Sequence, residues 1–191
     1  MKRAWGRACV AVGLASGLAA LPAAGSVESE LAFHRGVVAF GDGKLAAARR
    51  SFERVLADDP EDREALRYLA LILKAQGQSG RALELQDRAL ALDPMDRDLV
   101  FDRGVTLLEL GRNAEARAAM EQVLADDPGD ARARFYAGVA AYRTRDMSTA
   151  LPNLELAAEL DPTLAVQARY YAGPAEASIG DPSAAAGSFS V

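Results

Sequence analysis

The chain has 191 residues, of which 50% are hydrophobic and 26% charged, and its formal net charge is −5. This acidic balance argues against binding nucleic acid through a basic surface. The single cysteine, Cys9, excludes an internal disulfide, and the single histidine, His34, excludes a histidine cluster for a metal ion.

The first 25 residues have the pattern of a secretory signal peptide. Three basic residues precede an uncharged, alanine-rich run over 8–24, and small residues at 23–25 offer a cleavage site. The run has 17 residues, short of the roughly 20 strongly apolar residues that span a membrane, so an uncleaved anchor is the less favoured alternative. Cleavage near Gly25 would leave 19 basic and 27 acidic residues, a net charge of −8. We therefore expect a protein exported to the periplasm or cell envelope, with no membrane span after the leader is removed.

The remainder of the chain repeats one pattern with a period of 34 residues. Four prolines mark the period, at Pro60, Pro94, Pro128 and Pro162. The same spacing separates a row of small residues (Gly36, Ala70, Gly104, Gly138) and a row of alanines (Ala48, Ala82, Ala116, Ala150). Between these rows lies a turn signal, which is Gly43, Gly77 and Gly111 in three copies and Arg145-Asp146 in the fourth. A fixed period of this length is typical of stacked supersecondary units.

Each copy predicts two helices joined by a turn. In the second copy Leu66, Leu69, Ala70 and Leu73 follow the i, i+3, i+4, i+7 spacing of an amphipathic helix. The small residues would let two antiparallel helices approach closely where they cross. The Asp-Pro step that closes each copy stops the second helix, because proline cannot continue it.

These features together resemble the tetratricopeptide repeat (TPR). The resemblance implies an all-α fold, a right-handed α-α superhelix of four complete helical hairpins and a degenerate fifth, preceded by the signal peptide at 1–25. The repeat domain would cover 29–191, with units at about 29–62, 63–96, 97–130 and 131–164 and a partial unit at 165–191.

The fifth unit matches less well than the others. Its segment 168–173 repeats 133–138 with an offset of 35 residues instead of 34. Pro174 falls inside the first helix of this unit, where a proline costs about 3 kcal/mol unless the helix kinks. We therefore expect residues from about 173 onward to be irregular or frayed.

In the TPR family the first helix of each unit lines a concave groove that usually holds a peptide. The resemblance assigns four rows to this groove: Phe33, Val37 and Phe40; Arg67, Leu71 and Lys74; Asp98, Phe101, Val105 and Leu108; and Arg132, Phe135, Val139 and Tyr142. Tyr170 is the corresponding aromatic of the fifth unit. The alternative is that Phe101 and Phe135 only fill the contact between successive units.

Charges at the rim of this groove change sign along the chain. Glu30, Glu64 and Asp98 form an acidic row, whereas Arg132 and Arg143 lie in the fourth unit. Such a groove would orient a peptide of mixed charge, with its carboxylate end at the arginines; the alternative is that the acids only favour the helix dipoles. The TPR domains that clamp chaperone C-termini use Lys and Asn in the groove of the first two units, so Phe33, Val37 and Tyr68 argue against that ligand.

No catalytic constellation or cofactor motif is present in the sequence. The acidic pairs Asp58-Asp59 and Asp126-Asp127 precede prolines at the corners between copies, where we expect carboxylates to cap the following helix. We therefore expect a non-enzymatic scaffold that binds a protein or peptide, without cofactor, metal or nucleic acid. The alternative is the N-terminal periplasmic module, or a truncated relative, of an outer-membrane secretion or assembly protein. An uncapped end of the stack would also allow a homodimer.

Overall fold

The computed structural model describes the backbone of residues 24–180 and the side chains of residues 27–175. Within that range all of the regular secondary structure is helical, as the sequence predicts. The α-helices are α1 (Ala24–Gly41), α2 (Leu45–Asp58), α3 (Arg63–Ala75), α4 (Ser79–Leu92), α5 (Arg97–Glu109), α6 (Asn113–Asp126), α7 (Ala131–Arg143), α8 (Met147–Leu160) and α9 (Ala165–Gly180). Residues 1–23 of the predicted leader and the second helix of the fifth unit lie outside the described residues; the last two residues of the predicted leader, at 24–25, begin α1. Among the helices described, none combines the length and the hydrophobicity needed to cross a bilayer.

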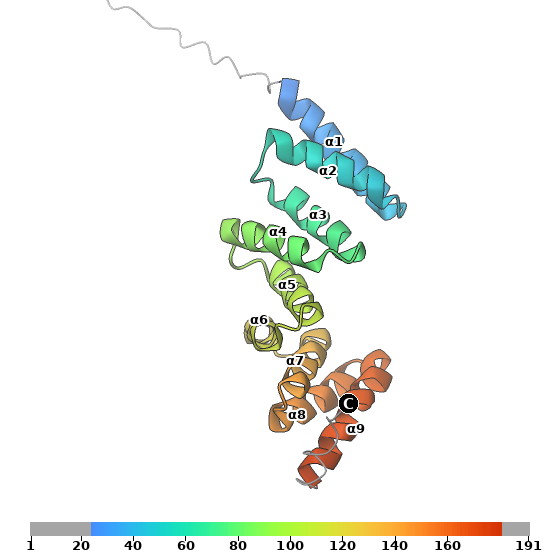
Figure 1. Cartoon of the computed structure of the whole chain (residues 1–191), viewed down its shortest axis with the longest axis vertical. Coiled ribbons are helices and arrows are strands. Elements are labelled where there is room, and N and C mark those ends of the chain that lie inside the picture. The colour runs from blue at the N-terminus through green and yellow to red at the C-terminus, as the bar shows by residue number, and fades with distance from the viewer. Residues whose placement is uncertain (1–23, 181–191) are drawn as a thin grey trace, which may run out of the picture.

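The helices stack in chain order into an elongated array (Figure 1). Each odd-numbered helix from α1 to α7 forms an antiparallel hairpin with the helix that follows it, and each hairpin packs on the next. The first helices of consecutive units also contact each other directly; α5 contacts α7, and α7 contacts α9. Side chains at equivalent positions of successive units are therefore brought into neighbouring rows.

A residue in the left-handed conformation closes each of the four hairpins. Gly43, Gly77 and Gly111 have φ of 71°, 72° and 74°. Arg145 takes the same place in the fourth hairpin, with φ of 62°. Glycine adopts this region freely because it has no Cβ, which explains why three of the four turns use it.

Small residues occupy the crossing point of the two helices of each unit. A Cβ on Gly36 would lie 2.8 Å from the Phe52 ring, and one on Gly138 would lie 2.7 Å from Cγ of Leu154. In the second unit Ala70 fills this place and is 1% exposed. The predicted close approach at the crossing is confirmed.

The corners between units are capped by a different aspartate from the expected one. Asp62, Asp96 and Asp130, two residues after the prolines, are the N-caps of α3, α5 and α7 and accept the N–H of Ala65, Leu99 and Ala133. The aspartate before each proline instead accepts an N–H within the loop, as Asp59 does from Glu61. The expectation that Asp58-Asp59 and Asp126-Asp127 cap these helices was therefore wrong, because the proline and one further residue separate Asp59 and Asp127 from the N-cap position.

Helix α9 continues through Pro174 to Gly180, so the prediction of an irregular chain from residue 173 was wrong up to that point. One side of the helix is anchored, because Ala168, Ala172 and Ala175 are buried, and α9 packs against α8 and α7. Pro174 itself is exposed. Tertiary packing of the alanine side therefore outweighs the hydrogen bond that the proline removes.

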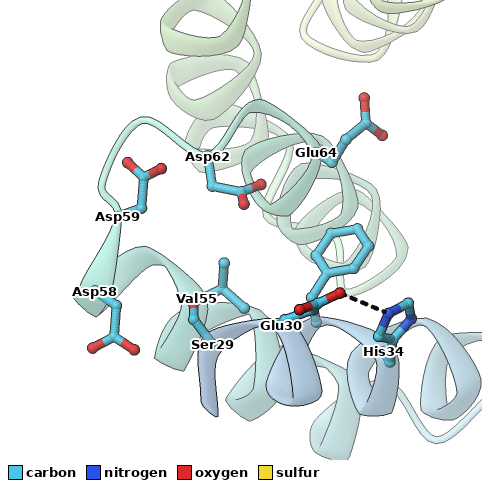
Figure 2. A pocket seen from close by; sticks show the side chains of 9 residues that line it. Ser29, Glu30, His34, Val55, Asp58, Asp59, Asp62 and Glu64 are labelled. Carbon is cyan, nitrogen blue, oxygen red and sulfur yellow. Dashed lines mark ion pairs between the residues drawn. The ribbon is translucent and has the colours of Figure 1, made fainter. Parts of the chain in front are cut away.

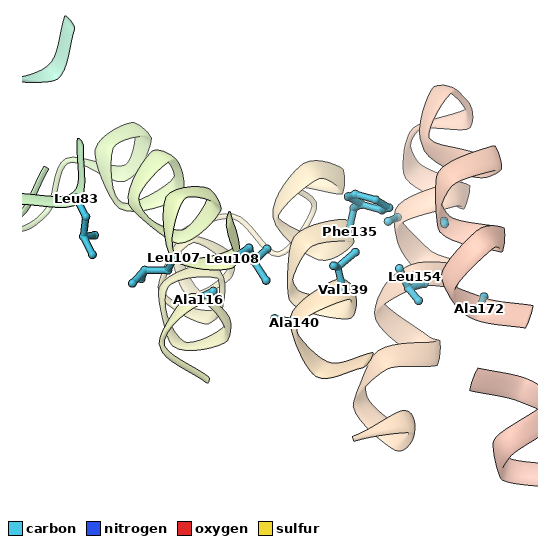
Figure 3. Close-up of a cluster of buried hydrophobic side chains, with 11 residues drawn as sticks. Leu83, Leu107, Leu108, Ala116, Phe135, Val139, Ala140, Leu154 and Ala172 are labelled. Atoms are coloured by element: carbon cyan, nitrogen blue, oxygen red, sulfur yellow. The ribbon is translucent and has the colours of Figure 1, made fainter. Parts of the chain in front are cut away.

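The interior is a chain of apolar clusters that pass from unit to unit. The largest contains residues of α4 to α9, from Leu83 through Leu107 and Phe135 to Ala172 (Figure 3). Phe52, Leu66, Met120 and Leu154 are fully buried. Because each cluster is shared between neighbouring units, one hairpin alone could not bury its apolar side.

Candidate functional site

The structure brings the predicted groove residues onto adjoining first helices, but with unequal exposure. Four of them are buried: Phe101, Leu108, Phe135 and Val139. Eight are half-buried: Phe33, Val37, Phe40, Arg67, Leu71, Lys74, Val105 and Tyr142. Only Asp98 and Arg132 are exposed. A partner that lies along these helices would therefore meet the half-buried and exposed members of the set.

The phenylalanines of the floor make contacts between units. Phe33 meets Tyr68, Phe101 meets Tyr136 and Phe135 meets Tyr171, each edge-to-face, with ring centroids 6.0, 5.6 and 6.1 Å apart. Such ring pairs add to the burial energy of an interface. Phe101 and Phe135 thus fill the contact between successive units, as the alternative interpretation held. Tyr171 makes this contact in the last unit, whereas Tyr170 is 75% exposed.

The second unit departs from this aromatic row. Arg67 stands where the first, third and fourth units carry phenylalanine. Asp102 of the next unit stands where the contact partners of those phenylalanines are tyrosines. Burial raises the pKa of Asp102, while Lys74, Arg67 and Arg132 act in the opposite direction and Asp98 adds to the rise. Arg67 also lies 3.6 Å from the Asp98 carboxylate. The middle of the first-helix surface is therefore polar, between aromatic contacts on either side.

Two arginines were expected to hold the carboxylate end of a ligand. Arg132 lies over the ring of Phe101, with its guanidinium carbon 4.4 Å from the ring centroid, and remains exposed. Arg143 instead donates a hydrogen bond from Nη1 to the main-chain oxygen of Leu108 at 2.7 Å. The stacked Arg132 presents the edge of its guanidinium to solvent. One N–H donor of Arg143, by contrast, is already engaged in a hydrogen bond to the neighbouring unit.

A cavity of about 630 Å³ opens beside this surface, where α1, the end of α2 and the start of α3 meet (Figure 2). Its apolar wall is formed by Phe33 and Val55. The remaining lining is rich in carboxylates: Glu30, Asp58, Asp59, Asp62 and Glu64, together with Ser29 and His34. Glu30 and His34 lie 3.9 Å apart. The cavity is thus apolar on one side and strongly acidic on the other.

Only part of this cavity was predicted from the sequence. Phe33 belongs to the predicted groove, and Glu30 and Glu64 to its acidic rim, whereas Asp59 was assigned only to helix capping and Asp62 was given no role. Within the described residues, no group of three or more His, Cys, Asp or Glu side chains is arranged to hold a metal ion.

Comparisons with known proteins agree with the repeat architecture. A family model described as tetratricopeptide repeat matches residues 33–96 and 101–165. No curated protein sequence matches the chain. Among solved structures, MamA from Desulfovibrio magneticus RS-1 superposes with a TM-score of 0.75 at 23% identity, covering 83% of this chain and 89% of that one.

A second solved structure resembles the chain at higher identity. YrrB, described as a TPR protein with an unusual peptide-binding site, superposes with a TM-score of 0.69 at 27% identity and covers 76% of each chain. The similarity to MamA bears on the fold alone, and both neighbours are superhelical stacks of the same kind of hairpin.

Proposed function

Because the chain belongs to the tetratricopeptide repeat family, we propose that it is a non-enzymatic scaffold that binds a segment of a partner protein along its first helices. The observation that carries the proposal is the surface formed by α1, α3, α5 and α7. Half-buried apolar side chains such as Val37, Leu71 and Val105 lie there beside charged ones in consecutive rows. The peptide-binding site named for the YrrB structure supports the same use of the fold.

Binding on this surface would combine apolar contact with charge. Val37, Leu71 and Val105 offer the apolar part of their surface, and Arg132 offers a guanidinium already oriented by the Phe101 ring. Aromatic and arginine side chains are favoured anchors of protein interfaces. The buried phenylalanines support the rows from below and set the spacing between units.

The proposal places this activity in the periplasm or cell envelope. The support for this location is the signal-peptide pattern of residues 1–25, which has a basic start followed by an uncharged run. Sequencing the N-terminus of the protein purified from its source tests this part. A mature chain that begins near residue 26 supports export, and an intact leader contradicts cleavage.

A charge-reversal experiment tests the binding surface. In the variant Lys74→Glu/Arg132→Glu, two cations of the first-helix surface change sign; Lys74 is half-buried and Arg132 exposed. We expect this variant, used as bait in the source extract, to lose the partner that the wild type captures, because repulsion or lost contacts weaken the complex.

The matched control is Arg50→Glu/Arg81→Glu, which makes the same change in charge at exposed positions on the second helices α2 and α4. This control should capture the partner as the wild type does. Equal capture by both variants, or loss only in the control, would show that the partner binds elsewhere.

A further inference from the structure

The corners between units contain a repeated arginine that the first unit lacks. The first residue of α3 is Arg63 and that of α5 is Arg97, 34 residues later. The same place in the first unit, 34 residues before Arg63, is held by Ser29, which lines the acidic cavity. The fourth unit has Ala131 there.

Each of the two arginines binds the aspartate pair of the following corner. The Arg97 Nη2 atom lies 3.1 Å from Asp127 and 2.5 Å from Asp130. Arg63 binds Asp93 through Nη1 and lies 3.8 Å from Asp96. The spacing Asp-x-x-Asp, folded into this corner, is therefore a guanidinium site at two places in the same molecule.

The first corner has the same aspartate pair in the same local structure. Asp59 accepts a hydrogen bond from the main-chain N–H of Glu61 at 3.0 Å. At the third corner, Asp127 accepts the equivalent hydrogen bond from Gly129, also at 3.0 Å. Asp62 accepts the N–H of Ala65 at 2.8 Å, matching the 2.9 Å bond from Ala133 to Asp130. The two carboxylates are thus held by the main chain in the arrangement that receives arginine elsewhere.

No arginine of the described chain fills that place. The guanidinium of Arg54 is taken by Glu28 at 2.9 Å and reaches only Asp58, at 3.9 Å. Arg88 donates to the main-chain oxygen of Pro60 at 2.7 Å. Among the ion pairs formed by residues 27–175, Asp59 and Asp62 take part in none.

The fourth corner shows that the arginine and the aspartate pair are lost together. There Ala131 replaces the arginine and Leu164 replaces the second aspartate, while Asp161 accepts both the N–H and the hydroxyl of Thr163. Of the four corners in the described chain, the first is therefore the one that keeps both aspartates but has no arginine for them.

We propose that the cavity at Ser29 receives the guanidinium of an arginine presented by the bound partner segment. Asp59 and Asp62 would hold the charged head, and the methylene stem would pack on Phe33 and Val55. Arginine fits better than lysine because the two equivalent corners hold a guanidinium, and because a guanidinium is more weakly hydrated than an ammonium and can stack on an aromatic ring such as Phe33. The inference rests on the proposed function and adds a residue type to the ligand.

A titration with small peptides tests the site directly. The full chain, labelled with ¹⁵N, is titrated with acetyl-Gly-Arg-Gly-amide, with the neutral citrulline analogue and with the lysine analogue. The arginine peptide should shift the amide signals of Ser29, Phe33 and Asp62, with an affinity at least roughly fivefold above that of the citrulline peptide, because only the former is charged. Lysine should bind more weakly than arginine.

Two substitutions complete the test. Ser29→Arg restores the arginine found at the other corners and should abolish the shifts while leaving the protein folded; Ser29→Ala should leave them unchanged. Asp59→Asn should weaken arginine binding, whereas Asp93→Asn, at a corner already filled by Arg63, should not. Equal binding of the arginine and citrulline peptides, or unchanged binding by Ser29→Arg, would overturn the proposal.

Failure here can be separated from failure of the scaffold function. If the arginine peptide does not bind but partner capture still depends on Lys74 and Arg132, the arginine site is wrong and the binding surface stands. The opposite result is that the peptide binds the wild type but not Ser29→Arg, while partner capture is unchanged by Lys74→Glu/Arg132→Glu. In that case the arginine site stands and the proposed binding surface is wrong.

Discussion

Gly138 lies so close to Leu154 that a Cβ atom at residue 138 would be 2.7 Å from the leucine Cγ and 3.2 Å from the main-chain oxygen of Ala150. Leu154 is fully buried and the oxygen belongs to a helix, so neither can move freely. We predict that Gly138→Ala lowers the free energy of unfolding by about 1–3 kcal/mol, measured by urea denaturation. At Gly104 the nearest atom is the flexible end of Met120, at 2.4 Å, so Gly104→Ala should cost less. A larger loss at 104 than at 138 would contradict this account of the crossing.

The left-handed turn residues allow a conformational effect to be separated from packing. Gly77 has φ of 72°, Gly80 lies three residues later in the first turn of α4, and no atom lies within 4 Å of a Cβ at either position. Gly77→Ala should therefore cost about 1 kcal/mol from backbone strain alone, whereas Gly80→Ala should be neutral or stabilising. Thermal unfolding of the two variants checks this. Equal stability would show that the turn does not require the left-handed conformation.

The corner arginines predict that the same substitution has different effects at two equivalent caps. Asp62 and Asp130 both cap a helix, and asparagine caps nearly as well as aspartate. Asp130 also binds Arg97, and its side chain is 22% exposed. Asp130→Asn should therefore cost about 1 kcal/mol, while Asp62→Asn should change stability little or raise it by relieving repulsion in the acidic cavity. Equal losses in chemical denaturation would mean that the Arg97 contact contributes nothing.

Asp102 predicts a pH dependence. Burial raises its pKa in the folded protein, against the opposing effect of Lys74, Arg67 and Arg132, so the ionised carboxylate is less favourable there than in the unfolded chain. Its contribution to stability is therefore greatest below the unfolded pKa and is lost as pH rises through the folded pKa. Asp102→Asn should unfold at higher urea than the wild type at pH 7, and this advantage should shrink as the solution is acidified.

The exposed neighbour Asp98 supplies the control for the pH experiment. Its side chain is 74% exposed and lies beside Arg67, so Asp98→Asn should not reproduce the gain at neutral pH. An Asp102→Asn variant whose stability follows that of the wild type at every pH would show that the carboxylate of Asp102 is not destabilised by burial.

The period of the chain was enough to predict the hairpins, the glycine turns and the close crossings. These features depend on residues near one another in sequence, such as Gly77 between its two helices, and they recur in each copy. The continuation of α9 through Pro174 was not predicted, because it depends on alanines buried against α8. Helix propensity gives the cost of a proline inside a helix, but it does not include the tertiary packing that compensates for that cost.

The candidate site was predicted less completely than the fold. Matching rows identified the residues of the first helices, but not that Phe101 and Phe135 are 8% and 7% exposed, because burial there depends on Tyr136 and Tyr171 of the next units. The arginine position was visible in the sequence as the column Ser29, Arg63, Arg97 and Ala131. The role of this arginine could not be predicted from the sequence, because Arg97 and Asp130 are 33 residues apart and only the folded corner shows that they bind each other.

Site-specific photocrosslinking in the source cells tests most directly whether the first helices form the binding surface. A benzoylphenylalanine replaces Asp98 or Arg132 on the first helices, or Arg50 or Arg81 on the second helices, all of which are exposed. We predict that residues 98 and 132 crosslink to the same partner protein and that residues 50 and 81 do not. Crosslinks to that partner only from 50 and 81, or from none of the four, would contradict it.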